Sequence, residues 1–543
     1  MTYDYMTTTK RMIPGFERTK AGKDRLIFVA AFASGMTTLA VELSASRLLG
    51  SVFGTSNLVW ANVIGLILLY LTIGYFVGGR WADRSPHHQT FYTILIWGAF
   101  LSALIPLISR PVLHLAAQAV VGARAALAMG SFVSVLVLFS APVTLLGCIS
   151  PFAIRLAIHS PDEAGKISGQ VYAMSTLGSM IGTFVPVLYL IPELGTFRTF
   201  ILFGGILYII GFIGLWYHTG ARALRWLWMP IVVLILSIWV LQGPLRPPSD
   251  GNTLLYDDES EYNYIQIQED QAGYRYLYLN EGQGVHSVWH PVGYIYGGTW
   301  DIFLAAPYFN TPPYVPQNVE NLLVIGLAAG TIPRQYIKVY GNIPIDGVEI
   351  DPGIIESAAI YFDMNETTMP SLRVHAQDGR FVLNQLQNRY SVVAIDAYRP
   401  PYIPWHLTTV EFFREVREHL LPNGVVAINV GRTRTDRRLV DAMARTMLEV
   451  FPTVHAIDVS KSFNTILVGT MQPTRVENLQ QNYAHLPDDT DPVLREVLAT
   501  SANSVVSIQP SNIVFTDDRA PVETLVDALV LNFLLHGNMD EIR

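Results

Sequence analysis

Seven segments of the chain are long and apolar enough to cross a lipid bilayer, and they restrict the first half of the molecule to helices. A bilayer offers no water to backbone N–H and C=O groups, and about 20 apolar residues in a helix cross its hydrocarbon core. We therefore predict a polar tail over residues 1–24 and a multi-span α-helical membrane domain over residues 25–242. Its transmembrane helices are expected at about 26–50, 58–79, 90–109, 126–148, 168–192, 199–217 and 226–242.

The positive charges of the connecting loops predict which end of this domain faces the cytoplasm. With the amino terminus inside, the inner segments carry 12 Lys and Arg residues and the outer short loops carry 3. Cytoplasmic loops are enriched in Lys and Arg, so we predict a multi-pass protein of the cell membrane with a cytoplasmic amino terminus. Seven spans would place the carboxy-terminal half outside, whereas one span fewer would place it inside, and the sequence leaves that side open.

Residues 321–351 carry the pattern of a nucleotide-binding α/β unit. A short apolar run, a turn between Gly326 and Gly330, and a helix that Thr331 is suited to cap follow one another in order. A second apolar run then ends at the acidic residue Glu349. Glycine lets a backbone approach a ligand closely, and an acid at the tip of the second strand accepts hydrogen bonds from ribose hydroxyls. The pattern therefore predicts a nucleoside site.

The remainder of the second half divides by composition and periodicity. We interpret residues 243–261 as a linker rich in Pro and Gly, and residues 262–310 as a small β subdomain in which Tyr and Ile alternate with polar residues. Predicted strands and helices alternate over residues 311–475, which is typical of a doubly wound, mostly parallel Rossmann-like sheet. Residues 476–543 are predicted to form a tail of loop and helix that contains the acidic segment 516–523.

Charge and cysteine content exclude several classes of function. Residues 1–246 carry 17 Lys and Arg against 8 Asp and Glu, whereas the remaining residues carry 19 against 36. The second half is thus strongly acidic, which disfavours nucleic acid as a partner and tolerates a cationic substrate. The single cysteine, Cys148, excludes an intrachain disulfide and leaves no basis for a cysteine metal site. No metal site is predicted.

Short motifs of the second half, taken in order, resemble those of spermidine synthases: LNEGQ at 279–283, VIGLAAG at 324–330, VEID at 348–351, QDGR at 377–380 and AID at 394–396. Two further motifs, IPWHLTTVE at 403–411 and TDDRAPVE at 516–523, resemble the group that fuses a multi-span membrane domain to such a synthase-like domain. In the first half, GGRWADR at 78–84 resembles the loop between helices two and three of major facilitator transporters, although we favour the simpler interpretation, an anchor of positive charge.

The resemblance implies a role for each of the residues that match the family's motifs. It implies that Gly326 and Gly330 line the nucleoside site and that Glu349 holds the ribose hydroxyls. It also implies that Asp378, with Gly379 beside it, accepts a hydrogen bond from the adenine amino group. The residues themselves also allow simpler interpretations, in which Glu349 pairs with a lysine and Asp378 is a turn residue.

Two more residues, Asp396 and Gln283, take roles from the resemblance. Asp396 would stand where the family carries the acid that takes a proton from the attacking amine, or orients that amine. Gln283 would come from the small β subdomain and cover the substrate. In the simpler interpretation Asp396 caps a loop. The co-substrate implied is decarboxylated S-adenosylmethionine or S-adenosylmethionine, with no tightly bound cofactor.

The chain also departs from the family at acids that hold cationic amino groups. Ala329 stands in the glycine turn where aminopropyltransferases carry an acid, and Arg399 stands where a second acid precedes a proline. A further acidic pair is replaced near residues 286–288. Either Asp517, Asp518 and Glu523 fold back as substitutes, or they belong to a capping or solvated acidic turn. Arg399 either clasps a substrate carboxylate, which suits intact S-adenosylmethionine, or lies on the surface.

These observations predict a membrane-anchored transferase that uses an adenosylmethionine-type nucleoside, with aminopropyl transfer to an amine as the first hypothesis. A methyltransferase or an aminocarboxypropyl transferase is the second hypothesis. The third is a non-catalytic scaffold or sensor, which the missing acids keep open. The expected partners are the lipid bilayer, a small amine or other acceptor, and a second copy of the chain or another subunit of a membrane complex.

Overall fold

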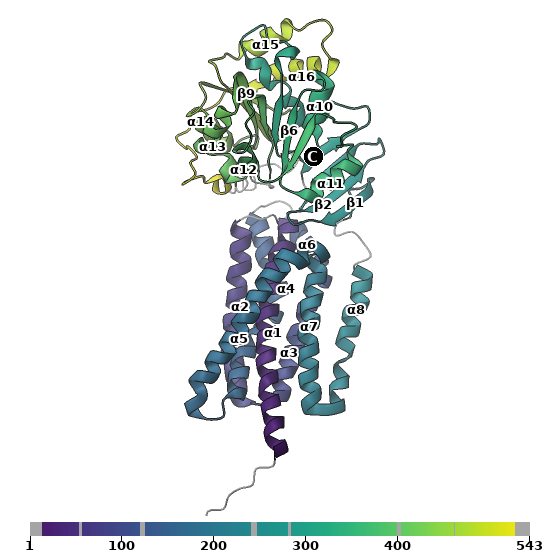
Figure 1. Cartoon of the computed structure of the whole chain (residues 1–543), viewed down its shortest axis with the longest axis vertical. Helices are drawn as coiled ribbons and strands as arrows, with labels where there is room; N and C mark the ends of the chain where they lie inside the picture. Colours follow the sequence, from purple (N-terminus) through teal and green to yellow (C-terminus); the bar gives the residue numbers. More distant parts are fainter. Residues whose placement is uncertain are drawn as a thin grey trace, which may run out of the picture. The chain divides into compact units, whose positions relative to one another are not determined.

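The computed structural model describes residues 14–53, 57–119, 125–240, 247–280, 284–398, 403–460 and 462–526. The chain divides into two compact units. The first is helical and comprises Met1–Leu49, Leu58–Gln118 and Gly130–Gly243. The second consists mainly of Pro244–Arg543 and contains the sheets. Figure 1 shows both units, coloured along the sequence.

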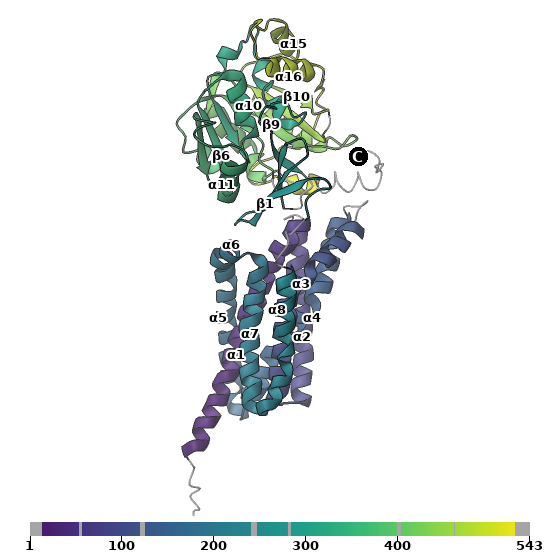
Figure 2. The same cartoon turned by 90° about the vertical axis from the view of Figure 1, so that its right-hand side faces the viewer.

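Long helices run side by side in the helical unit, as Figures 1 and 2 both show. Six of its segments in the described residues are long and apolar enough to cross a membrane, one fewer than predicted. The seventh predicted segment forms the shorter helix α8, Trp228–Val240, after the 3-10 turn η3, Gly220–Trp226. The six segments lie in α1 (Pro14–Phe53), α2 (Asn57–Arg84), α3 (His88–Ala119), α4 (Ala125–Ala157), α5 (Ala164–Val185) with η2 (Pro186–Leu190) and α6 (Ile191–Leu194), and α7 (Thr196–Thr219).

Small residues let two helices of this unit pack closely, while large apolar side chains face outward. A Cβ added at Gly178 or Gly182 of α5 would lie within 2.0 Å of a backbone oxygen of Phe32 or Met36 on α1. Side chains such as Phe76, 65% exposed, lie on the outside of the unit. An apolar exterior of this extent is expected where hydrocarbon rather than water surrounds a helix bundle.

The small sheet of the second unit has four antiparallel strands in sequential order. They are β1 (Thr253–Glu259), β2 (Tyr264–Glu269), β3 (Arg275–Leu279) and β4 (Val285–Trp289). The first strand lies inside the stretch interpreted from the sequence as a linker. Its acidic end, Asp257–Glu259, masked the alternation of a strand, because charged residues are common on an edge strand that must not pair further.

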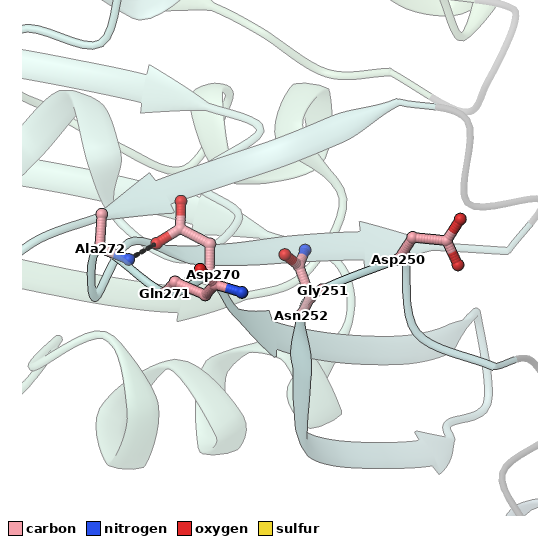
Figure 3. Close-up of a pocket in the computed structure, with 6 residues that line it drawn as sticks. All are labelled: Asp250, Gly251, Asn252, Asp270, Gln271 and Ala272. Atoms are coloured by element: carbon pink, nitrogen blue, oxygen red, sulfur yellow. Dashed lines mark hydrogen bonds between the residues drawn. The ribbon is translucent and has the colours of Figure 1, made fainter.

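The β2–β3 turn of the small sheet is built around Asp270. Its carboxylate accepts hydrogen bonds from the backbone N–H groups of Ala272 and Tyr274, both at 2.9 Å. Gly273 follows in the left-handed conformation, with φ of 89°. These backbone hydrogen bonds, together with one from the Tyr276 hydroxyl, hold the pKa of Asp270 below its usual value against the opposing effect of burial. A cavity of about 300 Å³ lies between this turn and residues 250–252, as Figure 3 shows.

The large sheet has the order β12-β10-β11-β9-β8-β5-β6-β7. The strands β7, β6, β5, β8 and β9 are parallel, and β11 pairs antiparallel with both β9 and β10. This confirms the predicted doubly wound, mostly parallel sheet. Its strands are β5 (Leu322–Ile325), β6 (Ile345–Glu349), β7 (Leu372–Ala376), β8 (Tyr390–Ile395), β9 (Leu420–Gly431), β10 (Thr453–Asp458), β11 (Asn464–Thr470) and β12 (Val505–Val506).

Two sets of helices cover the two faces of the large sheet, because successive side chains of each strand point to opposite sides. Leu323 and Ile325 pack in one core with α12 (Gly379–Leu383), α13 (Val410–Glu418) and α14 (Arg438–Met447). The opposite core, which contains Leu322 and Val324, includes α9 (Thr299–Phe303), α10 (Thr331–Tyr340), α15 (Glu477–Ala484) and α16 (Pro492–Ala502). Beyond β6 lies α11 (Pro352–Tyr361).

The tail is more ordered than the predicted loop and helix. Two of its residues, Val505 and Val506, form β12 and pair with β10 at the edge of the large sheet. Phe515 is fully buried, its N–H donates to the Thr446 hydroxyl, and its carbonyl accepts from Val410 N–H. The tail therefore packs on α13 and α14 as part of the second unit.

Candidate functional site

Glu349 and Asp396 flank Gly326 at the carboxyl ends of three adjacent parallel strands. The last residue of β5, Ile325, pairs with Val348 of β6 on one side and with Ile395 of β8 on the other. Neighbouring strands lie about 4.8 Å apart, so the two acids stand roughly 10 Å apart with the glycine turn between them. In open α/β sheets this edge is where ligands bind.

The backbone of Gly326 requires glycine. Its φ is 88°, and an added Cβ would lie 2.6 Å from backbone atoms of Asp396 and Ala397. Its N–H donates to the Val348 carbonyl at 2.9 Å, while Asp396 N–H donates to the Ile325 carbonyl at 2.8 Å. The turn thus joins the ends of β6 and β8 with no side chain between them.

The glycine turn ends at Gly330, where α10 begins, and Thr331 does not cap that helix as predicted. Gly330 is the residue before the first helical position and has a φ of 79°. The Thr331 hydroxyl instead accepts from Val288 N–H and donates to the Val288 carbonyl, both at 3.0 Å. Because Val288 belongs to β4, this hydroxyl joins the small sheet to the start of α10.

Ser287 of β4 occupies the space beside the position where the resemblance leads us to expect an acid. Its hydroxyl accepts a hydrogen bond of 2.9 Å from Ala329 N–H, and both residues are buried. The wall of the turn is therefore neutral at this point. Neighbouring His286 contributes no fixed charge either, because burial lowers the pKa of its imidazole to about 4.

The carboxylate of Glu349 faces the glycine turn. One oxygen accepts from Ala328 N–H at 2.9 Å and the other from Asp351 N–H at 3.1 Å. The side chain is 8% exposed, and burial raises the pKa of the carboxyl to about 7, although these backbone hydrogen bonds act in the opposite direction. Each oxygen still has a lone pair for a further hydrogen bond.

Asp351, two residues on, fastens the small sheet to the large one. One oxygen caps α11 by accepting from Gly353 N–H at 2.9 Å. The other oxygen accepts from the Ser260 hydroxyl at 2.6 Å and the Asn263 amide at 2.7 Å, in the turn between β1 and β2. In the sequence Asp351 is the last residue of the VEID motif, and its position before Pro352 was the signal of a helix cap.

Asp396 begins a chain of polar side chains that the sequence did not reveal. Its carboxylate accepts from the Asn429 amide at 2.8 Å, and the Asn429 oxygen accepts from the Asn464 amide at 2.8 Å. Burial raises the pKa of Asp396 to about 6, while the Asn429 hydrogen bond lowers it. The Tyr398 hydroxyl is also buried here, and burial and the charge of Asp396 raise its pKa. A carboxyl with a pKa near 6 suits proton transfer near neutral pH.

Asp378 caps α12, whereas the simpler interpretation made it a turn residue. One oxygen accepts from the N–H groups of Arg380 and Phe381, both at 3.0 Å, and the other contacts His406 Nε2 at 2.9 Å. The hydrogen bond from His406 holds the pKa of Asp378 below its usual value. Gly379 starts the helix and is buried beside Ile325. Asp378 therefore lies at the same edge of the sheet as Glu349 and keeps a partly exposed carboxylate.

The two acids of the closing motif have different surroundings. Both oxygens of Asp517 accept from the Arg380 guanidinium, and one also accepts from the Thr409 hydroxyl at 2.6 Å. Its backbone N–H donates to the Glu411 carboxylate at 3.0 Å. Asp518 is exposed. Gln283 and Arg399, the remaining predicted substrate-binding residues, lie outside the described residues.

Two cavities among the described residues lie away from this edge. The small one borders the β2–β3 turn, and a larger one of about 790 Å³ lies among helices of the first unit. Neither is lined by Glu349 or Asp396. Within the described ranges, no group of three His, Cys, Asp or Glu side chains is placed to hold a metal ion.

Comparison with known proteins places this edge in a recognised domain. Residues 308–464 match the family model of the spermine/spermidine synthase domain. The chain is 30% identical over 287 residues to a probable polyamine aminopropyl transferase of Bifidobacterium longum, an alignment that covers 50% of this chain and 62% of that protein. More than a third of that relative is thus unmatched. The carboxy-terminal half of the chain therefore carries a spermidine synthase domain.

Two further likenesses fall in the same half of the chain. A polyamine aminopropyltransferase of Vibrio vulnificus is 29% identical over 280 residues, which cover 49% of this chain and 88% of that protein. Among solved structures, a probable spermidine synthase from Corynebacterium glutamicum superposes with a TM-score of 0.37 at 18% identity, covering 49% of this chain and 98% of that chain.

Proposed function

We propose that the spermidine synthase domain of this chain transfers an aminopropyl group from decarboxylated S-adenosylmethionine to an amine, and that the helical unit holds the domain at a membrane. The observation that carries the proposal is the placement of Glu349 and Asp396 on either side of the bare backbone of Gly326. One acid is available to the nucleoside and the other to the reacting amine.

The residues at the edge fit a nucleoside co-substrate. Each oxygen of Glu349 accepts one hydrogen bond from a backbone N–H, which fixes the carboxylate. Each oxygen keeps a second lone pair that can accept from a ribose hydroxyl. Gly326 leaves room for the ligand to approach the turn. The Asp378 carboxylate accepts a hydrogen bond from the adenine amino group, through a lone pair that neither the α12 backbone nor His406 uses. The resemblance assigns to Gln283 the role of covering the substrate.

Asp396 accepts the proton that the reaction releases. The unprotonated amine attacks the aminopropyl carbon bonded to the sulfonium, a new C–N bond forms, and the C–S bond breaks. Its electron pair stays on sulfur, which leaves as the neutral thioether methylthioadenosine. The amine nitrogen then carries one proton too many, and the ionised Asp396 carboxylate takes it. Asn429 fixes the orientation of that carboxylate.

A second candidate function rests on the neutral contact between Ser287 and Ala329. An aminopropyl ammonium buried beside this contact lacks the acid that balances its charge in aminopropyltransferases, and an uncompensated buried charge costs several kcal/mol. Intact S-adenosylmethionine carries its own carboxylate beside its ammonium, and Arg399 would bind that carboxylate. Methyl or aminocarboxypropyl transfer is the alternative that this observation favours, and a non-catalytic scaffold follows if neither donor reacts.

The membrane placement is supported by the six long apolar segments and their exposed apolar side chains. The amino terminus is assigned to the cytoplasm by loop charge. The side on which the synthase domain lies depends on whether α8, with 13 described residues, completes a crossing. A reporter fused at Arg543 decides between six crossings and seven.

Product analysis with each donor tests the proposed reaction. The full-length chain in detergent is incubated with a diamine and either decarboxylated or intact S-adenosylmethionine, and products are identified by mass spectrometry. The proposal expects methylthioadenosine and a diamine extended by one aminopropyl group from the decarboxylated donor. S-adenosylhomocysteine from the intact donor would establish methyl transfer instead. If neither donor gives a product, the non-catalytic scaffold is the interpretation that remains.

A further inference from the structure

The larger cavity, of about 790 Å³, lies wholly within the helical unit and belongs to no part of the nucleoside edge. It is formed where the turn from α2 to α3 meets the end of α7 and the 3-10 turn η3. Its volume falls in the range of sites that hold small organic ligands, about 300–1,000 Å³. Nothing in the synthase chemistry requires it.

The polar wall of this cavity has the composition of an anion site. His87, His88, His218 and Arg225 line it, and the described residues that line it include no Asp or Glu. The nearest acid in the sequence, Asp83, pairs with Arg155 at 3.3 Å. Positive and neutral donors without a competing carboxylate favour an anionic ligand.

Aromatic packing holds these polar groups in place. The rings of His88 and His218 stack with centroids 4.5 Å apart, and the Tyr92 ring lies 5.6 Å from His218. Tyr92 packs directly on Gly214 of α7, where an added Cβ would meet the ring at 2.2 Å. The histidines are therefore positioned by a tight contact between α3 and α7, which reduces the entropy lost on binding a ligand.

The other wall is apolar and aromatic. Ile94, Trp97 and Leu145 line it, and the Trp97 ring contacts Trp226 with centroids 6.0 Å apart. The Arg225 guanidinium lies 5.1 Å from the centre of the Trp226 ring. Trp together with Arg at the ends of apolar helices is characteristic of the boundary between lipid headgroups and hydrocarbon. The cavity thus presents cationic donors beside an apolar wall.

We infer that this cavity binds an anionic phospholipid, with the phosphate ester held by Arg225 and the histidines and the acyl chains along Trp97, Ile94 and Leu145. A planar guanidinium donates two parallel hydrogen bonds to phosphate oxygens, and the flanking imidazoles add further donors. The inference rests on the membrane placement in the proposed function. A soluble phosphate ester shares the headgroup chemistry but has no acyl chain for the apolar wall.

Binding of short-chain lipids to the full-length chain in detergent tests the inference. Dihexanoyl phosphatidylglycerol is titrated by microscale thermophoresis, beside dihexanoyl phosphatidylcholine and glycerol phosphate. We expect saturable binding of the first that is at least about tenfold tighter than of the other two. The choline cation of phosphatidylcholine offsets its phosphate charge and is repelled by Arg225, and glycerol phosphate has no acyl chains to bury against the apolar wall. Arg225→Gln and His218→Gln should each weaken it, Arg225→Gln by about tenfold. Arg222→Gln, an exposed arginine of the same 3-10 turn that does not line the cavity, should not.

Two results would overturn the inference, and a third separates it from the membrane placement. Equal binding of glycerol phosphate would assign the cavity to a soluble phosphate ester. If Arg225→Gln and Arg222→Gln weaken lipid binding equally, surface charge rather than this cavity accounts for the lipid preference. Flotation of the chain with neutral liposomes is measured in parallel. A chain that floats but fails the lipid titration refutes this site alone, whereas a chain that does not float refutes the membrane placement.

Discussion

Arg380 binds Asp517 through two parallel hydrogen bonds of 2.8 and 2.9 Å, although 137 residues separate them in the chain. The same guanidinium donates to both oxygens of Glu415 at 2.8 and 2.6 Å. Because Arg380 also belongs to the helix that Asp378 caps, the tail motif is fastened to the residues at the nucleoside edge. The QDGR, IPWHLTTVE and TDDRAPVE segments thus contact one another through side chains.

Removing the charge of Asp517 should loosen the tail. We expect Asp517→Asn to cost about 1–2 kcal/mol locally, since a charge-assisted pair becomes a neutral one. Exchange of the Thr516 and Arg519 amides, which bond to each other's carbonyls at 3.0 and 2.9 Å, should quicken about tenfold. Asp518→Asn, at the exposed neighbour, is the matched control and should change nothing. Equal exchange in both variants would show that the pair does not hold the tail.

The contact between Arg380 and Asp517 should also fail in acid. Arg380 lowers the pKa of Asp517 below its unfolded value. A carboxyl whose folded pKa is depressed contributes stability above its unfolded pKa, near 4, and loses it as the pH falls through the folded value. Exchange of the same amides, corrected for the intrinsic rate, should therefore quicken below about pH 4. A protection factor that is constant down to pH 2 would contradict this.

The pH profile of turnover should report Asp396. Burial raises the pKa of this carboxyl to about 6, and only the ionised form accepts a proton. Turnover should therefore show an inflection near pH 6 and fall below it, because protonated Asp396 cannot accept a proton. Asp396→Asn should lower turnover by a factor of about 10²–10⁴ and remove this inflection. Since the Asn429 amide lowers the pKa of Asp396, Asn429→Leu should move the inflection to higher pH. An unmoved inflection in Asn429→Leu would assign it to another group.

Ser287→Ala should destabilise the second unit although it removes a single atom. The Ala329 N–H would remain buried without its acceptor, which costs about 1–3 kcal/mol. The midpoint of denaturant unfolding of the full chain, followed by tryptophan fluorescence, measures this loss. Ser507→Ala at an exposed serine is the control. An unchanged midpoint for Ser287→Ala would mean that water reaches the turn.

The sequence predicted the elements that a local pattern of residues specifies. The helix predicted after the glycine turn is observed from Thr331 to Tyr340, because the turn precedes it and apolar residues recur along one of its faces. The strand Tyr390–Ile395 falls in the predicted alternation over residues 311–475, since a short apolar run between polar residues indicates a buried strand. The two-residue strand β12 was not predictable, because its pairing with β10 depends on the tail being packed in place.

Side-chain partners at the site were less predictable than the site itself. Glycine spacing and a terminal acid pointed to Gly326 and Glu349, and the structure brings them together at the edge of the sheet with Asp396. The hydrogen bonds from Asn429 to Asp396 and from His406 to Asp378 join residues roughly 30 positions apart on different elements. No local pattern records such pairs, because they depend on the order of strands in the sheet.

Equilibrium binding of methylthioadenosine to the full-length chain and to its Glu349→Gln variant tests the central claim most directly. In Glu349→Gln the side chain keeps its size, but an NH₂ group replaces one carboxylate oxygen. This NH₂ group faces the N–H of either Ala328 or Asp351 and cannot accept a hydrogen bond from ribose. The account predicts saturable binding that weakens at least about tenfold in Glu349→Gln and is unchanged in Glu356→Gln, at an exposed acid of α11. Equal binding by all three proteins, or none by the unaltered chain, would contradict it.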